Sequence, residues 1–356
     1  MSNIATASFA AANSGYGFRS FYGSIFGHES IKKRYIIKGG PGTGKSSFMK
    51  KIGMTQEARG RDVEYYLCSS DPDSVDGIVI DGAIALMDGT APHTVDTEIP
   101  GARDEIVDLL RFCDTKSLEC RFDEIKSLSS AKSSCYKAAY GYLSLMQRTA
   151  ELSEACVLPS LLEEKIKRSA ASIVSRFPAG DGFSKRIAMR SSFGMKGRAD
   201  LELYEKKAGR IYAVSDEYSF GYKYLEAIVE LARERRQAVT LSYSYLDTDR
   251  LDAVMFDKTG DCFIVYDDPK TYCEYEFFKN VNLRRFIDLK KMGSEKRQSY
   301  KALKKVENEI SELAKKELAM AGEYHFALEK IYISYMDFEA LAVEAERLSD
   351  RISKIL

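Results

Sequence analysis

A glycine-rich loop that ends in lysine and serine is the part of this sequence with the clearest chemistry. Residues 39–46 read Gly-Gly-Pro-Gly-Thr-Gly-Lys-Ser and satisfy the pattern G-x-x-x-x-G-K-[ST]. Glycines let successive backbone N–H groups turn toward one anion, because no Cβ blocks its approach. In such loops the lysine, here Lys45, reaches the β- and γ-phosphates of a nucleotide, and the serine hydroxyl, here Ser46, ligates Mg²⁺. The alternative is a glycine-rich turn with a chance lysine. The residues expected to hold the nucleotide are Gly39, Gly40, Pro41, Gly42, Thr43, Gly44, Lys45, Ser46 and Ser47.

Asp88 is the second expected Mg²⁺ ligand, besides Ser46. It ends the apolar run 84–87, which is where an aspartate that holds Mg²⁺, usually through water, is found. The alternative is a strand-ending aspartate that caps the next turn. No glutamate follows Asp88 directly, so an efficient base for hydrolysis must come from elsewhere in the chain.

Asp71 and Asp73 are candidates for that base. They follow the apolar run 63–67, on a loop that would face the ligand crevice of a parallel sheet. There they could position water, ligate Mg²⁺ or accept the proton of a substrate hydroxyl. Residues 71–74, Asp-Pro-Asp-Ser, are equally typical of a turn and a helix N-cap. With Lys45 and Asp88, these two aspartates complete the set of catalytic candidates.

Other residues could meet a γ-phosphate. His93 lies just beyond Asp88 and could sense it, although a lone loop histidine is also typical of a structural role. An arginine finger is expected of an active ATPase or phosphotransferase. The sequence does not choose among Arg103, Arg111 and Arg210.

The elements that would position the loop are a strand before it and a helix after it. Residues 35–38 are a short run rich in β-formers, and a helical pattern with apolar Phe48, Met49 and Ile52 follows. Strand, glycine loop and helix in this order are the context that makes the motif a phosphate-binding hypothesis. The runs 63–67, 78–80 and 84–87 add further strands, and 74–77 reads as a short helix. We therefore predict an α/β fold of the P-loop NTPase type, with a mostly parallel sheet flanked by helices.

The chain divides into two expected modules. Helical periodicity dominates from about Arg103 to Arg176, and residues 177–182, Phe-Pro-Ala-Gly-Asp-Gly, are the strongest linker signal. The first module is thus 1–176, with a helical arm over about 103–176. The second is 177–356, an α/β module with a C-terminal helical segment from about 285.

The second module repeats the first in outline. Residues 249–255 match 73–79 at an offset of 176, and Arg210 lies at the same offset from Arg34. Shared order at a nearly constant offset favours a tandem duplication, the alternative being chance similarity of two α/β units. In place of the glycine loop the second module has 215–222, Ser-Asp-Glu-Tyr-Ser-Phe-Gly-Tyr. Its two acids would repel a triphosphate, so only one nucleotide site is expected.

The composition indicates an ordinary globular protein of the cytoplasm. The chain has 356 residues, with Lys+Arg and Asp+Glu both totalling 53, so overall charge does not indicate nucleic-acid binding. Its seven cysteines are scattered and odd in number, which is typical of reduced thiols in a cytoplasmic protein. Residues 1–18 lack the basic region of a signal peptide, and no run approaches the roughly 18 apolar residues of a membrane span.

Several segments resemble one family. GGPGTGKSSFMKKIG, VEYYLCSSDPDSVDGIVI, IALMDGTAPHTVD and PGARDEIVDL are similar to an uncharacterised group of bacterial P-loop ATPase-like proteins, built as two tandem modules with long helical segments. The resemblance covers essentially the whole chain and is strongest over 10–110. It implies ATP binding and no particular substrate. Family members commonly look nucleotide-competent in the second module too, and this sequence departs from them there.

Three functions follow from this reading. The first is a slow or partner-stimulated ATPase that binds ATP and Mg²⁺ and acts as a switch, with helical arms that could meet a protein partner. The second is a phosphotransferase acting on a nucleotide or small molecule, with Asp71 or Asp73 at the acceptor. The third is a non-catalytic, ATP-bound scaffold. The choice of ATP over GTP rests on the resemblance and on the lack of an evident N/T-K-x-D guanine signature.

Overall fold

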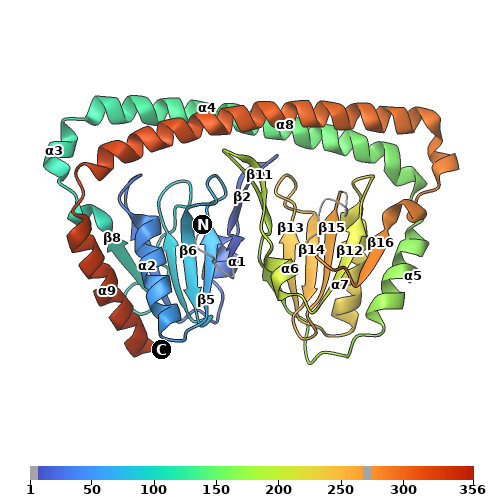
Figure 1. Ribbon diagram of the computed structural model, residues 1–356, viewed down its shortest axis with the longest axis horizontal. Coiled ribbons are helices and arrows are strands. Elements are labelled where there is room, and N and C mark those ends of the chain that lie inside the picture. Colours follow the sequence, from blue (N-terminus) through green and yellow to red (C-terminus); the bar gives the residue numbers. More distant parts are fainter. Residues whose placement is uncertain (1–6, 268–274) are drawn as a thin grey trace.

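Two α/β units lie side by side beneath a pair of long helices (Figure 1). The computed structural model describes residues 7–267 and 275–356. Cys273 lies outside the described residues, and the other six cysteines are free thiols. Within the described residues, no helix is both long enough and apolar enough to cross a bilayer.

The first unit is a six-stranded sheet in the order β1-β5-β6-β7-β4-β8. β6 runs antiparallel to both its neighbours, and the other three pairs are parallel. The strand β4, between β7 and the edge strand β8, is apolar and fully buried over Tyr35, Ile36 and Ile37, as expected of a strand covered on both faces. The strands are β1 (Ala7–Phe9), β4 (Lys33–Lys38), β5 (Val63–Leu67), β6 (Val75–Ile80), β7 (Ile84–Asp88) and β8 (Asp104–Asp108).

The second unit has a sheet of the same size in the order β9-β13-β14-β15-β12-β16. Each strand runs in the same sense as its counterpart in the first sheet. The β-bulge at Tyr66/Leu67 recurs at Ser242/Tyr243. The strands are β9 (Lys185–Ile187), β12 (Arg210–Ser215), β13 (Val239–Tyr243), β14 (Leu251–Phe256), β15 (Asp261–Tyr266) and β16 (Lys279–Asn282). The predicted α/β class, with mostly parallel sheets flanked by helices, is confirmed.

Short elements complete each unit in the same order. A β-hairpin and a one-turn helix precede β4 in the first unit and β12 in the second, and a longer helix follows each of these strands. In the first unit these are β2 (Ala11–Ser14), β3 (Gly17–Ser20), α1 (Tyr22–Phe26) and α2 (Lys45–Ala58); in the second they are β10 (Ser191–Gly194), β11 (Gly197–Asp200), α6 (Leu203–Lys207) and α7 (Gly221–Glu234). The connecting turns are η1 (Leu109–Phe112), α3 (Thr115–Glu119), η2 (Leu158–Ser160) and η4 (Leu283–Phe286).

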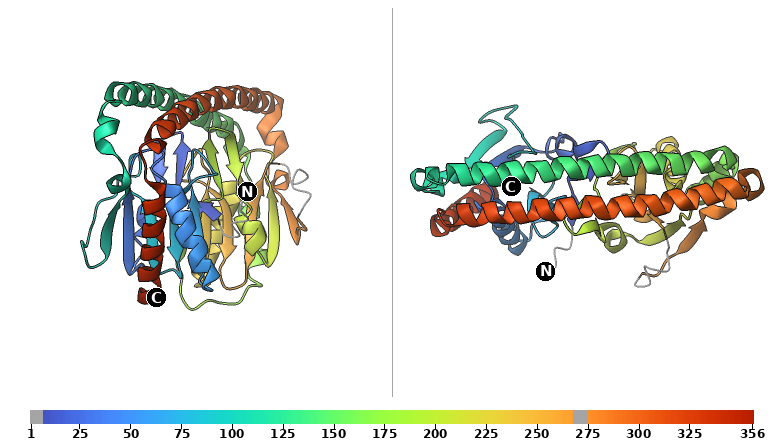
Figure 2. Two further views of the ribbon diagram at one scale, coloured as in Figure 1. Left: turned by 60° about the vertical axis from the view of Figure 1, so that its left-hand side comes forward. Right: turned by 90° about the horizontal axis from the view of Figure 1, so that it is seen from above.

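The two long helices, α4 and α8, connect the two units. α4 (Phe122–Val157) leads from the first unit to the second, and α8 (Leu289–Ile333) returns beside it in the opposite direction (Figures 1 and 2). α5 (Glu163–Val174) then packs on α7, whereas α9 (Phe338–Ile355) packs on α2. Each half of the chain therefore supplies a helix to the unit built by the other half.

The hairpins join the units reciprocally. The Phe9 amide donates to the Met189 carbonyl (2.8 Å) at the centre of the contact. The Gly15 amide donates to Leu246 (2.9 Å), and the Met195 amide donates to Ser70 (3.0 Å). Each hairpin thus binds the loop that follows β5 or β13 of the other unit, in the manner of a two-fold interface.

Two local predictions were wrong. In the segment 74–77, expected as a short helix, residues 75–77 begin β6, because the backbone there pairs with β5 and β7. Helical periodicity was expected from about Arg103, yet 104–108 form the edge strand β8. In that strand Asp104 and Val107 are buried whereas Ile106 and Asp108 are exposed, and pairing with β4 decides its conformation.

Candidate functional site

The glycine loop, residues 39–46, connects the end of β4 to the start of α2. Gly42 and Gly44 have φ of 70° and 85°, a region that side-chain-bearing residues rarely adopt. Thr43 is buried, and its hydroxyl donates to the Gly40 carbonyl (2.8 Å). Among the described residues, no side-chain oxygen caps the N-terminus of α2 at Gly44. The loop therefore presents a helix N-terminus that can accept an anion.

Lys45 lies folded back over this loop. Its ammonium donates to the carbonyls of Gly39 and Gly40 (2.9 Å each) and lies 3.6 Å from the Asp88 carboxylate. Both side chains are about 15% exposed, at 14% and 15%, so the pair is shielded but reachable. The structure thus brings together the two residues that the sequence places 43 positions apart.

Asp88 is held at the end of β7, next to β4. Its backbone pairs with Ile37, and its carboxylate accepts hydrogen bonds from the amide (2.8 Å) and the hydroxyl of Thr90. Burial raises the pKa of the Asp88 carboxyl, and the Lys45 ammonium and the Thr90 donors oppose that shift. Asp88 therefore both caps the following turn and faces the lysine.

The serines that follow Lys45 point to different places. The Ser46 hydroxyl accepts a hydrogen bond from the Val75 amide (2.9 Å) at the start of β6, which leaves oxygen lone pairs for a further partner. Ser47 is exposed. A hydroxyl at Ser46 and a carboxylate at Asp88 are hard oxygen ligands of the kind that Mg²⁺ prefers.

Asp71 and Asp73 are held by structural partners. The Asp71 carboxylate accepts from the Asp73 amide (3.3 Å) and the Ser74 hydroxyl (3.1 Å), so it forms the turn. Asp73 pairs with Lys196 of the second unit's hairpin at 2.6 Å, and this partner lowers the pKa of Asp73. The loop that carries these aspartates is therefore tied to the other unit.

Asp76 is a site residue that the sequence reading missed. It lies beside Val75 in β6, is only 7% exposed, and its carboxylate is 3.2 Å from His93 Nε2. Its charge also raises the pKa of Asp88. The signal was available, since an aspartate in an apolar strand calls for a partner, but the short-helix interpretation of 74–77 concealed it.

His93 is packed into the same corner. Its ring stacks on Tyr22 with centroids 4.5 Å apart and meets Phe18 edge-on at 4.8 Å. Among the described residues, no hydrogen-bond partner faces the buried His93 Nδ1. One ring nitrogen is thus fixed by Asp76 while the other is unused.

The second half of the chain covers the glycine loop. A Cβ built on Gly42 would lie 2.5 Å from the carbonyl oxygen of Glu329, and one on Gly40 would lie 2.7 Å from the ring of Tyr332. Both partners belong to the last turns of α8. These glycines are therefore needed for close packing as well as for loop geometry.

α9 continues this cover over the start of α2. A Cβ on Gly44 would lie 2.9 Å from the Leu341 side chain. Farther along, Lys51 pairs with Glu346 at 2.8 Å, and the Gln56 amide donates to Ser349 (2.8 Å). The helix that follows the glycine loop is thus bound along its length by the C-terminal helix.

The three arginines considered for a finger have other partners. Arg103 pairs with Asp104 at 2.9 Å, where β8 begins, at the opposite end of the sheet from the loop. Arg210 pairs with Asp261 at 2.7 Å in the second unit. Arg111 pairs with Glu344 of α9 at 2.8 Å.

The corresponding loop of the second unit carries its own anion. The Asp216 carboxylate accepts from the amides of Gly221 (2.5 Å), Phe220 (3.1 Å) and Tyr218 (3.3 Å). Burial raises the pKa of Asp216 to about 6, and these amides oppose the shift. The positive end of the α7 helix dipole is thus neutralised by the Asp216 carboxylate of the same loop.

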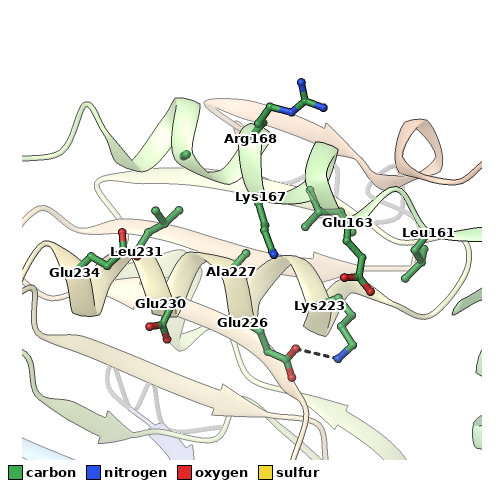
Figure 3. Close-up of a pocket in the computed structure, with 12 residues that line it drawn as sticks. Leu161, Glu163, Lys167, Arg168, Lys223, Glu226, Ala227, Glu230, Leu231 and Glu234 are labelled. Atoms are coloured by element: carbon green, nitrogen blue, oxygen red, sulfur yellow. Dashed lines mark hydrogen bonds and ion pairs between the residues drawn. The ribbon is translucent and has the colours of Figure 1, made fainter.

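A groove of about 730 Å³ lies elsewhere, between α5 and α7 (Figure 3). Lys223 and Glu226 pair along α7 at 3.2 Å, Lys167 points between the helices, and Arg168 turns away. Charge pairs within one helix are typical of a solvated face. The chemistry-bearing residues are gathered at the glycine loop instead.

Comparison with known proteins adds nothing to this geometry, because no protein-family model, no curated protein and no solved structure matches the chain.

Proposed function

We propose that this protein binds ATP and Mg²⁺ at the glycine loop and is a slow or partner-stimulated ATPase that acts as a nucleotide switch. The observation that carries the proposal is Lys45, held between the loop carbonyls and Asp88 at the uncapped start of α2. An ammonium, free helix amides and a nearby carboxylate together are what phosphate and its metal require.

The residues take distinct roles in this proposal. The loop amides and Lys45 bind the phosphates, and Ser46 and Asp88 hold Mg²⁺, which neutralises charge on the phosphates when bound. The Asp76 carboxylate lies 3.2 Å from one ring nitrogen of His93. That pair is the best-placed acid–base group near the loop, in place of the absent glutamate after Asp88.

The switch reading rests on the loop at 68–74. Val75, where this loop ends, donates to Ser46, while the Ser69 carbonyl accepts from Ser192 of the second unit (2.6 Å). A change at Ser46 therefore acts on a segment that both units hold. Such an arrangement suits a nucleotide-dependent change between two conformations.

We further propose that the second unit is a degenerate duplicate of the first, within the bacterial P-loop ATPase-like family that the chain resembles. The shared strand order, the shared strand directions and the bulges 176 residues apart support this. Asp216 lies 176 residues after Gly40. The same offset therefore relates the first loop, 39–46, which contains no acid, to the second loop, 215–222, which contains Asp216.

The test is ATP·Mg²⁺ binding and phosphate release by the wild type and by Lys45→Ala. We expect Lys45→Ala to lose binding by at least about 100-fold and to abolish release, because the ammonium acts in a shielded site. Lys223→Ala is the matched control, since it removes a lysine from the first turn of α7 and should change neither quantity. Failure of the wild type to bind any nucleoside triphosphate with Mg²⁺ contradicts the proposal. Transfer to a metabolite with little release indicates a phosphotransferase, and binding without turnover indicates a scaffold.

A further inference from the structure

One face of α4 carries a row of polar side chains. Tyr136, Tyr140, Gln147 and Glu154 follow one another along the helix at spacings of 4, 7 and 7 residues, which place them on one side of a helix with about 3.6 residues per turn. That side faces the two α/β units, because each of the four side chains is hydrogen-bonded to a loop or hairpin of a unit. The row therefore fastens one helix to both units (Figure 1).

The first end of the row is bonded to the loop after β5. The Ser70 hydroxyl in this loop accepts hydrogen bonds from the Tyr136 hydroxyl (3.1 Å) and from the Asn13 amide (3.2 Å). Asn13 is fully buried, its amide also donates to the Phe193 carbonyl of the second unit's hairpin (2.9 Å), and its oxygen accepts from Tyr140 (2.9 Å). Because such a buried network is costly to leave partly unbonded, a movement of Ser70 must move α4 or break these bonds.

The same loop is tied to the proposed Mg²⁺ ligand. The Ser46 hydroxyl accepts from the Val75 amide (2.9 Å), directly after the loop. The base of the loop is closed by a hydrogen bond from the Cys68 amide to the Ser74 carbonyl (3.0 Å), and Ser70 lies between these two residues. A shift of Ser46 toward a bound metal ion would therefore pass through Val75 to the loop that carries Ser70.

The other end of the row is bonded to the second unit. The Gln147 amide donates to the Asp247 carboxylate (2.8 Å). The Glu154 carboxylate accepts from Arg250 (2.7 Å) and from the Tyr222 hydroxyl. Asp247 and Arg250 lie in the loop after β13, which is the counterpart of the loop after β5, and Tyr222 lies in the first turn of α7. The helix thus holds corresponding loops at its two ends.

We propose that α4 is a conformational relay, through which a nucleotide at the glycine loop changes the loop after β13 and the start of α7. The inference rests on the proposed ATP site and names the regulation of that site. α4 is a single helix of 36 residues, and coupling between distant sites is carried by such rigid elements when both sites contact them. A displacement at Tyr136 is therefore carried to Gln147 and Glu154.

The relay gives the second unit a role although its own loop lacks the lysine. Tyr222, at the far end of the row, lies 176 residues after Ser46, at the near end. One unit would bind the nucleotide, and the corresponding segment of the other would respond to it. Because coupling between two sites is reciprocal, a partner that moves the loop after β13 would also change the nucleotide affinity of the first unit. That reciprocity is what partner-stimulated turnover requires.

The test follows hydrogen exchange of the peptides that cover 68–74 and 244–250 in the wild type, Tyr136→Phe and Tyr142→Phe. Tyr136→Phe removes only the hydroxyl that binds Ser70. Tyr142 is the matched control, since it lies on the same helix and its hydroxyl is bonded to no residue in the described part of the chain. Without nucleotide, we expect Tyr136→Phe to speed exchange of both peptides at least about threefold, because loss of one attachment loosens the helix at both ends. Tyr142→Phe should change neither.

The second half of the test adds ATP·Mg²⁺ to the same three proteins. Exchange of 244–250 should change at least about threefold in the wild type and in Tyr142→Phe. In Tyr136→Phe this change should fall below about 1.5-fold, although the variant should still bind ATP with an affinity within about tenfold of the wild type, because the glycine loop itself is intact.

Three outcomes overturn the inference. Faster exchange confined to 68–74 in nucleotide-free Tyr136→Phe means that the Ser70 contact acts only locally. A wild type that binds ATP without any change at 244–250 has no relay. An ATP-induced change at 244–250 that survives in Tyr136→Phe assigns the transmission to another element. If no variant binds nucleotide, the proposed function fails, and the nucleotide-free comparison still decides whether α4 couples the two loops.

Discussion

The loops that follow β4 and β12 occupy the same place in two sheets of the same strand order, yet their helix starts are capped differently. In the first loop, 39–46, Lys45 lies beside Asp88, and no side chain among the described residues caps the start of α2. In the second loop, 215–222, the carboxylate of Asp216 takes three amides for itself. A shared scaffold therefore does not imply a shared activity.

The difference can be traced to single positions. Asp216 stands where the first loop has Gly40, and Gly221 stands where it has Lys45. Exchanging a glycine for an acid supplies the anion internally, and exchanging the lysine for glycine removes the cation. These two differences give α7 a helix start that is capped by its own loop, without a lysine beside it.

The largest expected effect comes from moving the acid into the first loop. Gly40→Asp should lower ATP affinity by more than about 1,000-fold, because a carboxylate beside Lys45 competes with the phosphates and repels them. Gly40→Asn is the matched control, since it meets the Tyr332 ring in the same way without the charge. Isothermal titration with ATP·Mg²⁺ measures both. Equal losses in the two variants would assign the effect to the contact with Tyr332, and the electrostatic part of the comparison would be wrong.

A smaller effect is expected from titration of the acid in the second loop. Burial raises the pKa of Asp216 from its ordinary value of 3.8 to about 6, so the folded state binds this proton more tightly than the unfolded state. The free energy of unfolding should therefore fall as pH rises from about 4 to about 6, by on the order of 2–3 kcal/mol. Asp216→Asn keeps an acceptor for the amides but does not titrate, and should flatten this slope.

Urea unfolding at several pH values, followed by circular dichroism, measures that slope. Glu217→Gln removes the neighbouring acid, which is exposed and paired with Arg284 at 3.1 Å, and it should keep the wild-type slope. A slope that survives in Asp216→Asn would mean that another group is responsible.

The parts of the site that are contiguous in sequence could be predicted from it. Strand, loop and helix follow one another around Lys45, so their chemistry is readable from spacing alone. Asp88 could be placed because it ends an apolar run next in the sheet to β4. Asp76 was lost because its neighbours 71–74 also suit a turn and N-cap, and only strand pairing decides between the two.

The cover over the glycine loop could not be predicted. Gly42 and Glu329 are separated by almost the whole chain, and an amphipathic helix shows which of its faces is buried but not which surface that face meets. For the same reason the exchange of α5 and α9 between the units has no sequence signal. The sequence also could not choose the arginine finger. Ion pairs such as that of Arg103 with Asp104 depend on which end of the sheet each residue lies at, and the sequence alone does not show this.

The smallest expected effect concerns the ion pair between the units. Lys196 and Asp73 are 2.6 Å apart, with side chains 64% and 57% exposed. Lys196→Ala should cost less than about 0.5 kcal/mol of unfolding free energy, since exposed pairs contribute little, and should leave ATP affinity within about twofold. In the reciprocal hairpin the equivalent residue is Tyr16, which carries no positive charge.

The backbone hydrogen bonds of Gly15 and Met195, by contrast, are common to both hairpins, so we expect these shared contacts to hold the units together. A double-mutant cycle of Lys196→Ala and Asp73→Ala in urea unfolding measures the coupling of the ion pair. A coupling above about 1 kcal/mol, or a change in ATP affinity beyond that range, would contradict this expectation. It would mean that the ion pair of Lys196 with Asp73, which only one hairpin makes and which lies next to the segment that binds Ser46, links the second unit to the glycine loop.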